Sequence, residues 1–199
     1  MNYDRNTRPY HEPLATATYI REIEVGDVVW DLGSRFGYET VIAATLNERP
    51  ERVHTFEMTE SKVWKLQRLN RLDFNGALSV NHVAVGEQSQ GSHQLRLDDY
   101  ADRHGPPDFV TMDIETAEVP ALLGMRSTIE SATPTLLIEW HGTAMDHEGN
   151  HNDIASAMTL LRENYSTMLY CEEYRDSEAE WRPLHVDVPR INCQLLVKA

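Results

Sequence analysis

Lysine is scarce in this sequence, as are cysteine and long apolar runs. Of the 18 basic residues only Lys62, Lys65 and Lys198 are lysines, against 32 acidic residues and a formal net charge of −14. Nucleic-acid binding depends mainly on basic side chains that neutralise phosphates, so this charge argues against a nucleic-acid partner. No apolar run reaches the roughly 20 residues of a membrane span, and the segment after Met1 lacks the apolar core of a signal peptide. We therefore expect no membrane partner and a cytoplasmic location.

The acidic, lysine-poor composition resembles that of proteins from a high-salt cytoplasm. Acidic groups on a compact surface repel one another in dilute buffer, and 1 M salt shortens the Debye length to about 3 Å. We expect halophile-like behaviour, with an acidic protein from an ordinary cytoplasm as the alternative. The two cysteines, Cys171 and Cys193, form neither a disulfide framework nor a zinc-binding spacing, which predicts two buried thiols.

A chain of 199 residues with 41% hydrophobic residues suits one domain, residues 1–199. Residues 1–13 contain two prolines and no sustained period, which predicts an N-terminal arm. A short helix is expected over 14–21. No internal repeat or linker interrupts the rest.

The segment from Val28 to Ala44 is the centre of the predicted fold. Three apolar residues lead to Asp31, two glycines follow at 33 and 37, and the sequence after Gly37 has helical character. Gly33 allows a turn in which backbone N–H groups approach a ligand, and the next helix offers unpaired N–H donors. This pattern predicts a strand, a loop and a helix at a cofactor site, although glycines also end strands for structural reasons alone.

Apolar runs and helical periods alternate along the remaining chain. Strands are predicted at 28–32, 52–57, 78–85, 109–113, 134–141, 165–171 and 191–197. Helices are predicted at 38–47, 59–72, 98–104, 117–128 and 152–162, with a short strand or edge segment at 93–97 and a loop at 172–189. The alternation predicts an α/β fold: a doubly wound, mostly parallel seven-stranded sheet with helices on both faces. The last two strands form a hairpin-like pair, so the last strand is antiparallel.

Several predicted strands end in an acidic residue at the edge where ligands of such sheets bind. Glu57 lies 20 residues after Gly37, where nucleoside-binding folds place an acid on the ribose hydroxyls. The alternative is that Glu57 caps the helix beginning near Thr59. Asp113 ends the fourth strand, and the fifth ends in Glu139 and His141.

The residues of the loop after Asp31 favour S-adenosylmethionine over NAD as the cofactor. Ser34, Arg35 and Phe36 fill the positions where a dinucleotide site needs a further glycine, which disfavours NAD. Asp31 before the turn suits a cationic amino group, such as that of S-adenosylmethionine.

Five ordered segments together resemble the FkbM-type family of S-adenosylmethionine-dependent methyltransferases. Asp31 to Tyr38 is similar to the family's cofactor loop, and the other four matches are Phe56-Glu57, Val83 to Gly86, Asp113 to Glu118 and Ile138 to His141. The resemblance implies a Rossmann-like class I methyltransferase with S-adenosylmethionine as cofactor. It implies cofactor binding by Asp31, Gly33, Ser34, Gly37, Glu57, Met58, Ala84, Val85 and Asp113. The chain departs from the family pattern at Ser34-Arg35, Met58 and Thr116, which affects the expected pocket shape.

The implied reaction is O-methylation of a hydroxyl on a small molecule or sugar. Such a transfer needs alignment and a base, and the candidates for the base are Asp113, Glu115 and His141. Asp113 has the alternative role of orienting the cofactor, and His141 that of a satisfied core or rim histidine. The alternative function is a catalytically silent nucleoside-binding or interaction protein with the same fold. A nucleic-acid methyltransferase is disfavoured by the charge and by the absence of an N-P-P-[YF] tetrapeptide.

One loop after the fifth strand is rich in residue types that bind metals. It contains His141, Asp146, His147, Glu148, His151 and Asp153. Its Gly142, Gly149 and Asn150 define no fixed geometry, so we predict a solvated acidic loop and no metal site.

Overall fold

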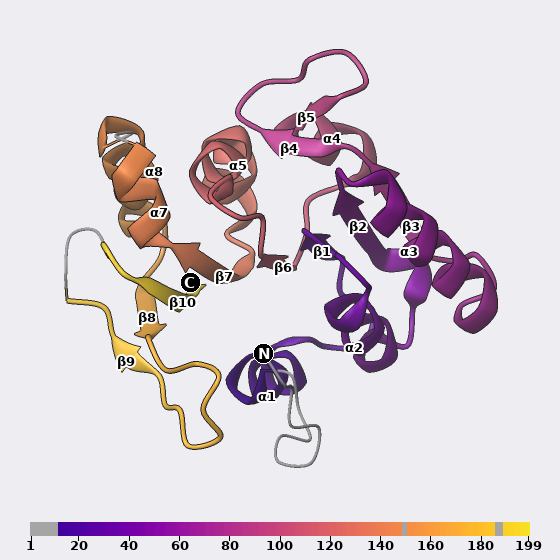
Figure 1. Ribbon diagram of the computed structural model, residues 1–199, viewed down its shortest axis with the longest axis horizontal. Helices are drawn as coiled ribbons and strands as arrows, with labels where there is room; N and C mark the ends of the chain where they lie inside the picture. Colours follow the sequence, from indigo (N-terminus) through magenta and orange to yellow (C-terminus); the bar gives the residue numbers. More distant parts are fainter. Residues whose placement is uncertain (1–11, 149–150, 186–188) are drawn as a thin grey trace.

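The computed structural model describes residues 12–148, 151–185 and 189–199, with the backbone alone for 146–148 and 151–152. Their main feature is an eight-stranded sheet in the order β3-β2-β1-β6-β7-β10-β8-β9 (Figure 1). The strands are β1 (Val29–Leu32), β2 (Val53–Glu57), β3 (Ser79–His82), β6 (Phe109–Met112), β7 (Thr135–His141), β8 (Thr167–Cys171), β9 (Arg182–Pro183) and β10 (Asn192–Lys198).

The strand directions confirm the predicted fold class. Strands β3, β2, β1, β6 and β7 are parallel, and β10 lies antiparallel between β7 and β8. Strand β9 adds a two-residue eighth strand within the predicted loop 172–189, because Tyr170 and Leu169 pair with Arg182 and Pro183.

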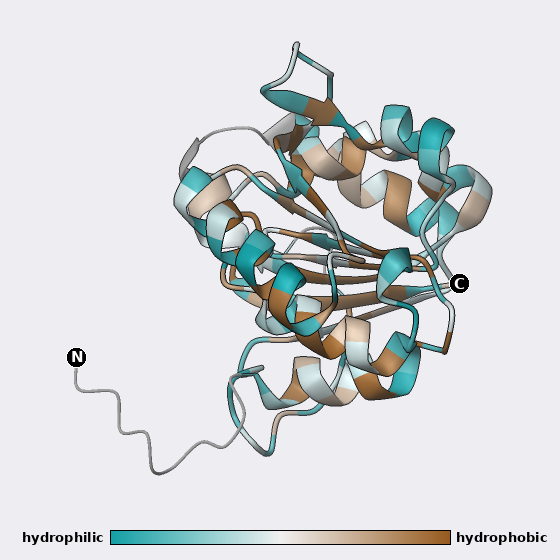
Figure 2. Ribbon diagram, turned by 90° about the vertical axis from the view of Figure 1, so that its right-hand side faces the viewer, coloured by the Kyte–Doolittle hydropathy of each residue, from teal (hydrophilic) through white to brown (hydrophobic). Residues whose placement is uncertain are grey.

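Helices cover both faces of the sheet, and the burial of adjacent strand residues explains why. In β1, Val29 packs with the cluster beside α1 (Pro13–Glu22), α2 (Tyr38–Asn47) and α3 (Glu60–Asp73). The next residue, Trp30, packs with the cluster beside α4 (Leu97–His104), α5 (Glu118–Gly124), α6 (Arg126–Ala132) and α8 (His151–Asn164). Successive strand side chains point to opposite faces, so a strand buried on both sides is mostly apolar. Figure 2 shows the apolar strands between two helical layers whose outer surfaces are largely hydrophilic.

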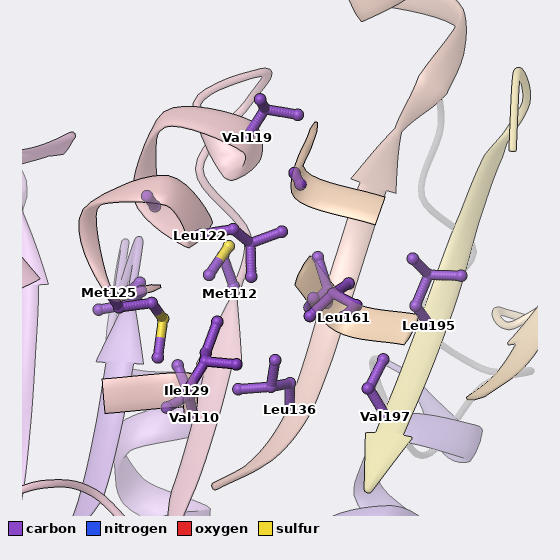
Figure 3. Packing of buried hydrophobic residues seen from close by; sticks show 14 of the residues in the cluster. Val110, Met112, Val119, Leu122, Met125, Ile129, Leu136, Leu161, Leu195 and Val197 are labelled. Atoms are coloured by element: carbon purple, nitrogen blue, oxygen red, sulfur yellow. The ribbon is translucent and has the colours of Figure 1, made fainter. Parts of the chain in front are cut away.

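The larger core lies between the second half of the sheet and helices α5, α6 and α8. Figure 3 shows Met112, Leu136 and Leu195 from three strands meeting Leu122 of α5 and Leu161 of α8. All five are at most 1% exposed. Burying a leucine or methionine side chain contributes about 1.5–3 kcal/mol, so this core fixes α5 against β7.

Two expected elements are divided in the structure, and two further elements are added. The predicted strand 78–85 is divided into β3 and β4 (Ala84–Gly86), and β4 forms a separate two-stranded sheet with β5 (Gln94–Arg96). The predicted helix 117–128 is divided into α5 and α6 at Gly124 and Met125. A Cβ on Gly124 would lie 2.2 Å from the carbonyl oxygen of Gly86, so α5 and β4 approach closely only because this residue is glycine. The structure also adds α7 (Gly142–Glu148) after β7 and a 3₁₀ turn, η1 (Pro50–Arg52).

The predicted arm ends earlier than expected. Residues 1–11 lie outside the described residues, but Glu12 is buried and Pro13 begins α1. The Glu12 carboxylate accepts a hydrogen bond from Gln194 Nε2 at 3.1 Å, which anchors the start of α1 to β10. The prediction of an arm is therefore wrong for residues 12 and 13. Cys171 and Cys193 are free and buried, as predicted. No helix in the described part of the chain has the length and apolar character of a membrane span.

Candidate functional site

One row of the sheet brings the predicted site residues together. Parallel pairing places Phe56, Leu32, Met112 and Ile138 side by side on β2, β1, β6 and β7. The residues that follow them are Glu57, Gly33, Asp113 and Glu139. A cleft of about 140 Å³, open to solvent, lies at this edge.

The lining of the cleft includes most of the residues expected to bind a cofactor. Gly33, Glu57, Met58, Ala84, Val85 and Asp113 line it, together with Arg35, Phe56, Thr59, Lys62, Val83, Ile114, Glu115 and Ala117. The apolar part of the wall comes from Phe56, Val83 and Val85, and Met58 is exposed beside them. A flat apolar ring suits this part of the wall, and Glu57, Asp113 and Glu115 add carboxylates to the lining.

Gly33 permits the close approach of β1 and β6 at the cleft floor. Its φ is +90°, and a Cβ there would lie 1.8 Å from the carbonyl oxygen of Asp113. Its N–H donates to the carbonyl of Phe56 at 2.9 Å, and the N–H of Asp113 donates to Leu32 at 2.9 Å. No side chain fits this position, so glycine is required by the fold as well as by any ligand.

Glu57 is buried and supports the rim of the cleft. Its Oε2 accepts the N–H of Arg35 at 3.1 Å, and its Oε1 accepts the N–H of Thr59 at 2.7 Å. Lys62 Nζ lies 3.9 Å from Oε2. Thr59 is the residue before α3, so Glu57 assists the start of that helix while it also faces the cleft.

Asp31, Ser34 and Gly37 are not among the residues that line the cleft, although they were expected to bind the cofactor. Asp31 is 2% exposed, and its Oδ2 accepts a hydrogen bond from Thr40. Ser34 Oγ donates to the carbonyl of Asp31 at 2.9 Å, and the Gly37 N–H donates to that of Ser34 at 2.7 Å. These hydrogen bonds fix the conformation of the loop between β1 and α2, although the three residues do not line the cleft. Burial raises the pKa of Asp31 to about 6.

Sequence reasoning missed two acids in this region, the half-buried Glu39 and the buried Glu12. Burial, together with the negative charge of Asp31, raises the pKa of Glu39 to about 8. Burial and the charge of Glu139 raise the pKa of Glu12 to about 7. Burial is the main cause of these raised pKa values and neighbouring carboxylates add to it, so a bound cation would lower the electrostatic energy. Glu39 could have been suspected from the sequence, because it lies two residues after Gly37 in the predicted cofactor loop. Glu12 could not, because only the tertiary fold brings it to this region.

The three expected catalytic residues lie together. His141 Nε2 is 3.9 Å from Asp113 Oδ1 and 3.8 Å from Glu115 Oε2. Asp113 and Glu115 line the cleft, and His141 lies behind them at the end of β7. Burial, and then the charge of Glu139, raises the pKa of Asp113 to about 6. A carboxyl of this pKa exchanges protons near neutral pH.

Glu118 is a further residue of the site that was not predicted. Its Oε1 lies 2.6 Å from His141 Nδ1, and its side chain is completely buried. This hydrogen bond is the main reason that the pKa of His141 is raised to about 9, although burial of the ring acts in the opposite direction. The available signal was the position of Glu118 at the end of the matched segment from Asp113.

Metal binding at this cluster is limited by an existing ion pair. Asp113, Glu139 and His141 each offer one ligand atom within 4.8 Å of the others. Glu139 Oε1 already accepts hydrogen bonds from Arg175 at 2.9 Å and Tyr174 at 2.5 Å. The Arg175 guanidinium therefore already supplies a positive charge at the Glu139 carboxylate, and we assign no metal ligand at this cluster.

The prediction of an acidic loop after β7 is wrong for most of its length, because residues 142–148 form α7 and α8 begins at His151. The side chains of Asp146, His147, Glu148 and His151 lie outside the described residues. Asp153 is exposed and lines a second cleft with Met145 and Ile154.

The loop after β6 contains two residues in a conformation that side chains disfavour. Glu115 has φ +52° and Thr116 has φ +78°. A β-branched residue at positive φ is an outlier, and such strain is typical of functional sites. The family pattern has glycine at the position of Thr116, and the left-handed backbone accounts for it.

A mostly parallel sheet with one inserted antiparallel strand, and a cleft at the ends of β1, β2 and β6, defines the Rossmann-like methyltransferase fold. The structure is similar to methyltransferase FkbM from Methylobacillus flagellatus, with 22% identity, a TM-score of 0.58, and coverage of 86% of this chain and 43% of that chain. It is also similar to precorrin-6y C5,15-methyltransferase from Geobacter metallireducens (12% identity, TM-score 0.53, 92% and 85% covered). An rRNA methylase from Streptococcus thermophilus shares the fold (16% identity, TM-score 0.54, 97% and 97% covered).

A family model described as the methyltransferase FkbM domain matches residues 42–167. The chain therefore belongs to the FkbM methyltransferase domain family, as its motifs predicted. The matched segment contains Glu57 and the motifs at 113–118 and 138–141, while the loop from Asp31 precedes it. The chain spans less than half the length of the FkbM structure. No curated protein sequence matches it significantly.

Proposed function

We propose that this protein is an S-adenosylmethionine-dependent methyltransferase that methylates a hydroxyl on a small molecule or sugar. One observation carries the proposal: a single cleft is lined by Gly33, Glu57, Ala84, Val85 and Asp113, which come from four separate motifs of the family.

The residues present fit the cofactor in three ways. Val83, Val85 and Phe56 form an apolar wall for an adenine ring, and Glu57 offers carboxylate oxygens for ribose hydroxyls. Asp113 lies at the same cleft, and the crowded negative charge beside it favours a positively charged ligand. When bound, S-adenosylmethionine supplies a methyl group on a positively charged sulfur.

The chain's own contribution to the transfer is alignment and proton removal. The cleft holds the reactants in line, and Asp113, Glu115 and His141 are the proposed acid-base groups. A net charge of −14 supports a small acceptor over a nucleic acid. The fold is shared with an rRNA methylase, so an RNA acceptor belongs among the compounds tested.

Cofactor binding is tested by calorimetric titration with S-adenosylmethionine, using Glu57→Ala and a matched control. Losing the ribose partners in a partly buried site costs about 1–3 kcal/mol, so we expect affinity to fall roughly ten- to a hundredfold. Glu60→Ala removes an acid that is exposed and is not among the cleft-lining residues, and it should bind like the unmodified protein. Unchanged affinity in Glu57→Ala would exclude this assignment, provided that both variants have native unfolding midpoints.

Turnover separates the proposed enzyme from a silent binding protein. Formation of S-adenosylhomocysteine is measured with sugars, hydroxylated small molecules and RNA as acceptors. Transfer to a hydroxyl compound supports the proposal. Tight binding without product from any acceptor supports a nucleoside-binding protein that has lost transfer.

A further inference from the structure

His141 is held in one orientation by a buried carboxylate. Its Nδ1 lies 2.6 Å from Glu118 Oε1, and that oxygen also lies 3.3 Å from the N–H of Thr116, which donates to it. Glu118 stands in the first turn of α5, which the core fixes against β7. Because the carboxylate accepts the proton of Nδ1, the other ring nitrogen is the one left for chemistry.

That other nitrogen, Nε2, lies near two carboxylates that line the cleft, those of Asp113 and Glu115. It lies 3.8–3.9 Å from oxygens of Asp113, Glu115 and Glu139, which is too far for a hydrogen bond. Within the described part of the chain, Nε2 has no hydrogen-bond partner. Asp113 and Glu115 line the cleft, so a hydroxyl placed beside them reaches Nε2.

We propose that His141 is the base of the transfer, taking the acceptor's proton at Nε2, and that Glu118 is the residue that positions it. The inference rests on the proposed function. The acceptor oxygen forms a bond to the methyl carbon and releases its proton to Nε2, while the carbon–sulfur bond breaks and its electron pair stays on sulfur. Glu118 keeps Nδ1 protonated throughout, which stabilises the imidazolium that results.

The charged groups around the His141 ring determine when Nε2 loses its proton and can act as a base. Glu118 on α5, Glu139 on β7, and Asp113 and Glu115 after β6 all face the ring with carboxylates, and Arg175 pairs with Glu139 from behind. These groups keep His141 protonated at neutral pH, consistent with its pKa of about 9. A second positive charge in the cleft lowers the pKa of His141 and so raises the fraction of neutral imidazole that can accept a proton at Nε2. A ligand with a sulfonium therefore favours the basic form of the ring more than a neutral thioether does.

The test follows the histidine ring signals by NMR during a pH titration, so no acceptor is needed. The signal of His141 is identified by its loss in His141→Gln. We expect Glu118→Gln to lower the pKa of His141 by roughly one unit or more, because one adjacent negative charge is removed. The control is Glu115→Gln, which removes a charge that is 72% exposed and 3.8 Å away, and it should shift the pKa much less.

The second arm compares two ligands in the unmodified protein. S-Adenosylmethionine should lower the pKa of His141 by roughly one unit relative to S-adenosylhomocysteine, which lacks the positive charge. This comparison tests the inference even if Glu118→Gln fails to fold. Equal pKa values with both ligands bound, or equal shifts in Glu118→Gln and Glu115→Gln, would overturn the inference alone. Failure of either ligand to bind would instead overturn the proposed function.

Discussion

At the scale of single residues, the site is dominated by carboxyl groups that hold protons more tightly than usual. Glu39 keeps its proton up to about pH 8 in the folded protein, whereas its ordinary pKa is 4.5. Folding therefore takes up a proton between these values, and stability falls as pH rises through this window. The raised pKa values of Asp31, Asp113 and Glu12 also make stability fall as pH rises. The pKa of His141 is raised from 6.5 to about 9, so its contribution to stability is lost as pH rises between those values.

Glu39→Gln should accordingly weaken the pH dependence of unfolding. We expect the unmodified protein to lose stability from about pH 5 to pH 8, and the variant to lose less because one titrating group is absent. Denaturant unfolding at several pH values measures this. Glu24→Gln is the control, since Glu24 is exposed on the turn before β1. Parallel curves for the Glu39 variant and the unmodified protein would contradict the raised pKa.

Residues such as Glu118 and Glu12 mark the limit of prediction from this sequence. The positions of Glu57 and Asp113 at the cleft could be predicted because each stands at the end of an apolar run, a pattern that is local; Asp31 has the same pattern but does not line the cleft. The contact of Glu118 with His141 joins residues 23 positions apart and depends on how α5 packs on β7. Glu12 meets Gln194 across 182 positions, a contact that no local pattern encodes.

At the scale of elements, the strands were more predictable than the segments between them. Apolar runs gave β1, β2, β6 and β7 closely, because their burial on both faces leaves a continuous signal. The break between α5 and α6 depends on the close contact of Gly124 with β4, and the separate β4-β5 sheet depends on tertiary pairing.

The loop between β6 and α5 is an element whose strain can be measured. Thr116→Gly should relieve the cost of a β-branched residue at φ +78°. Strain of this kind costs about 1–3 kcal/mol, and glycine adds back about 0.5–1 kcal/mol of unfolded-chain entropy, so a net gain of about 1 kcal/mol is expected. The readout is the free energy of unfolding in urea.

The matched control is Thr45→Gly, at an exposed position inside α2. Relative to alanine, glycine in a helix interior costs about 1 kcal/mol and threonine up to about 0.7 kcal/mol, so this variant should lose roughly 0.3 kcal/mol of stability. Equal losses in both variants would mean that the loop stores no strain at Thr116.

At the scale of the whole molecule, the dominant property is the net charge of −14 on 199 residues. The sheet and its helices bury the apolar side chains, so most of this charge lies on the surface or at the cleft. Self-repulsion of the folded state is screened by salt, and the acid-rich, lysine-poor composition is typical of proteins that work in high salt.

We therefore expect the unfolding midpoint to rise between dilute buffer and 1 M potassium chloride, and to continue rising above about 0.2 M, where the Debye length is already below 8 Å. A variant with Asp73→Asn, Asp102→Asn and Glu163→Gln removes three exposed negative charges for which the structure gives no ion pair. Its midpoint should be higher in dilute buffer and should rise less with salt, because less repulsion remains to be screened. A flat or falling midpoint for the unmodified protein would show that the acidic surface is not an adaptation to salt. Equal salt slopes in the two proteins would show that any rise has a source other than surface charge.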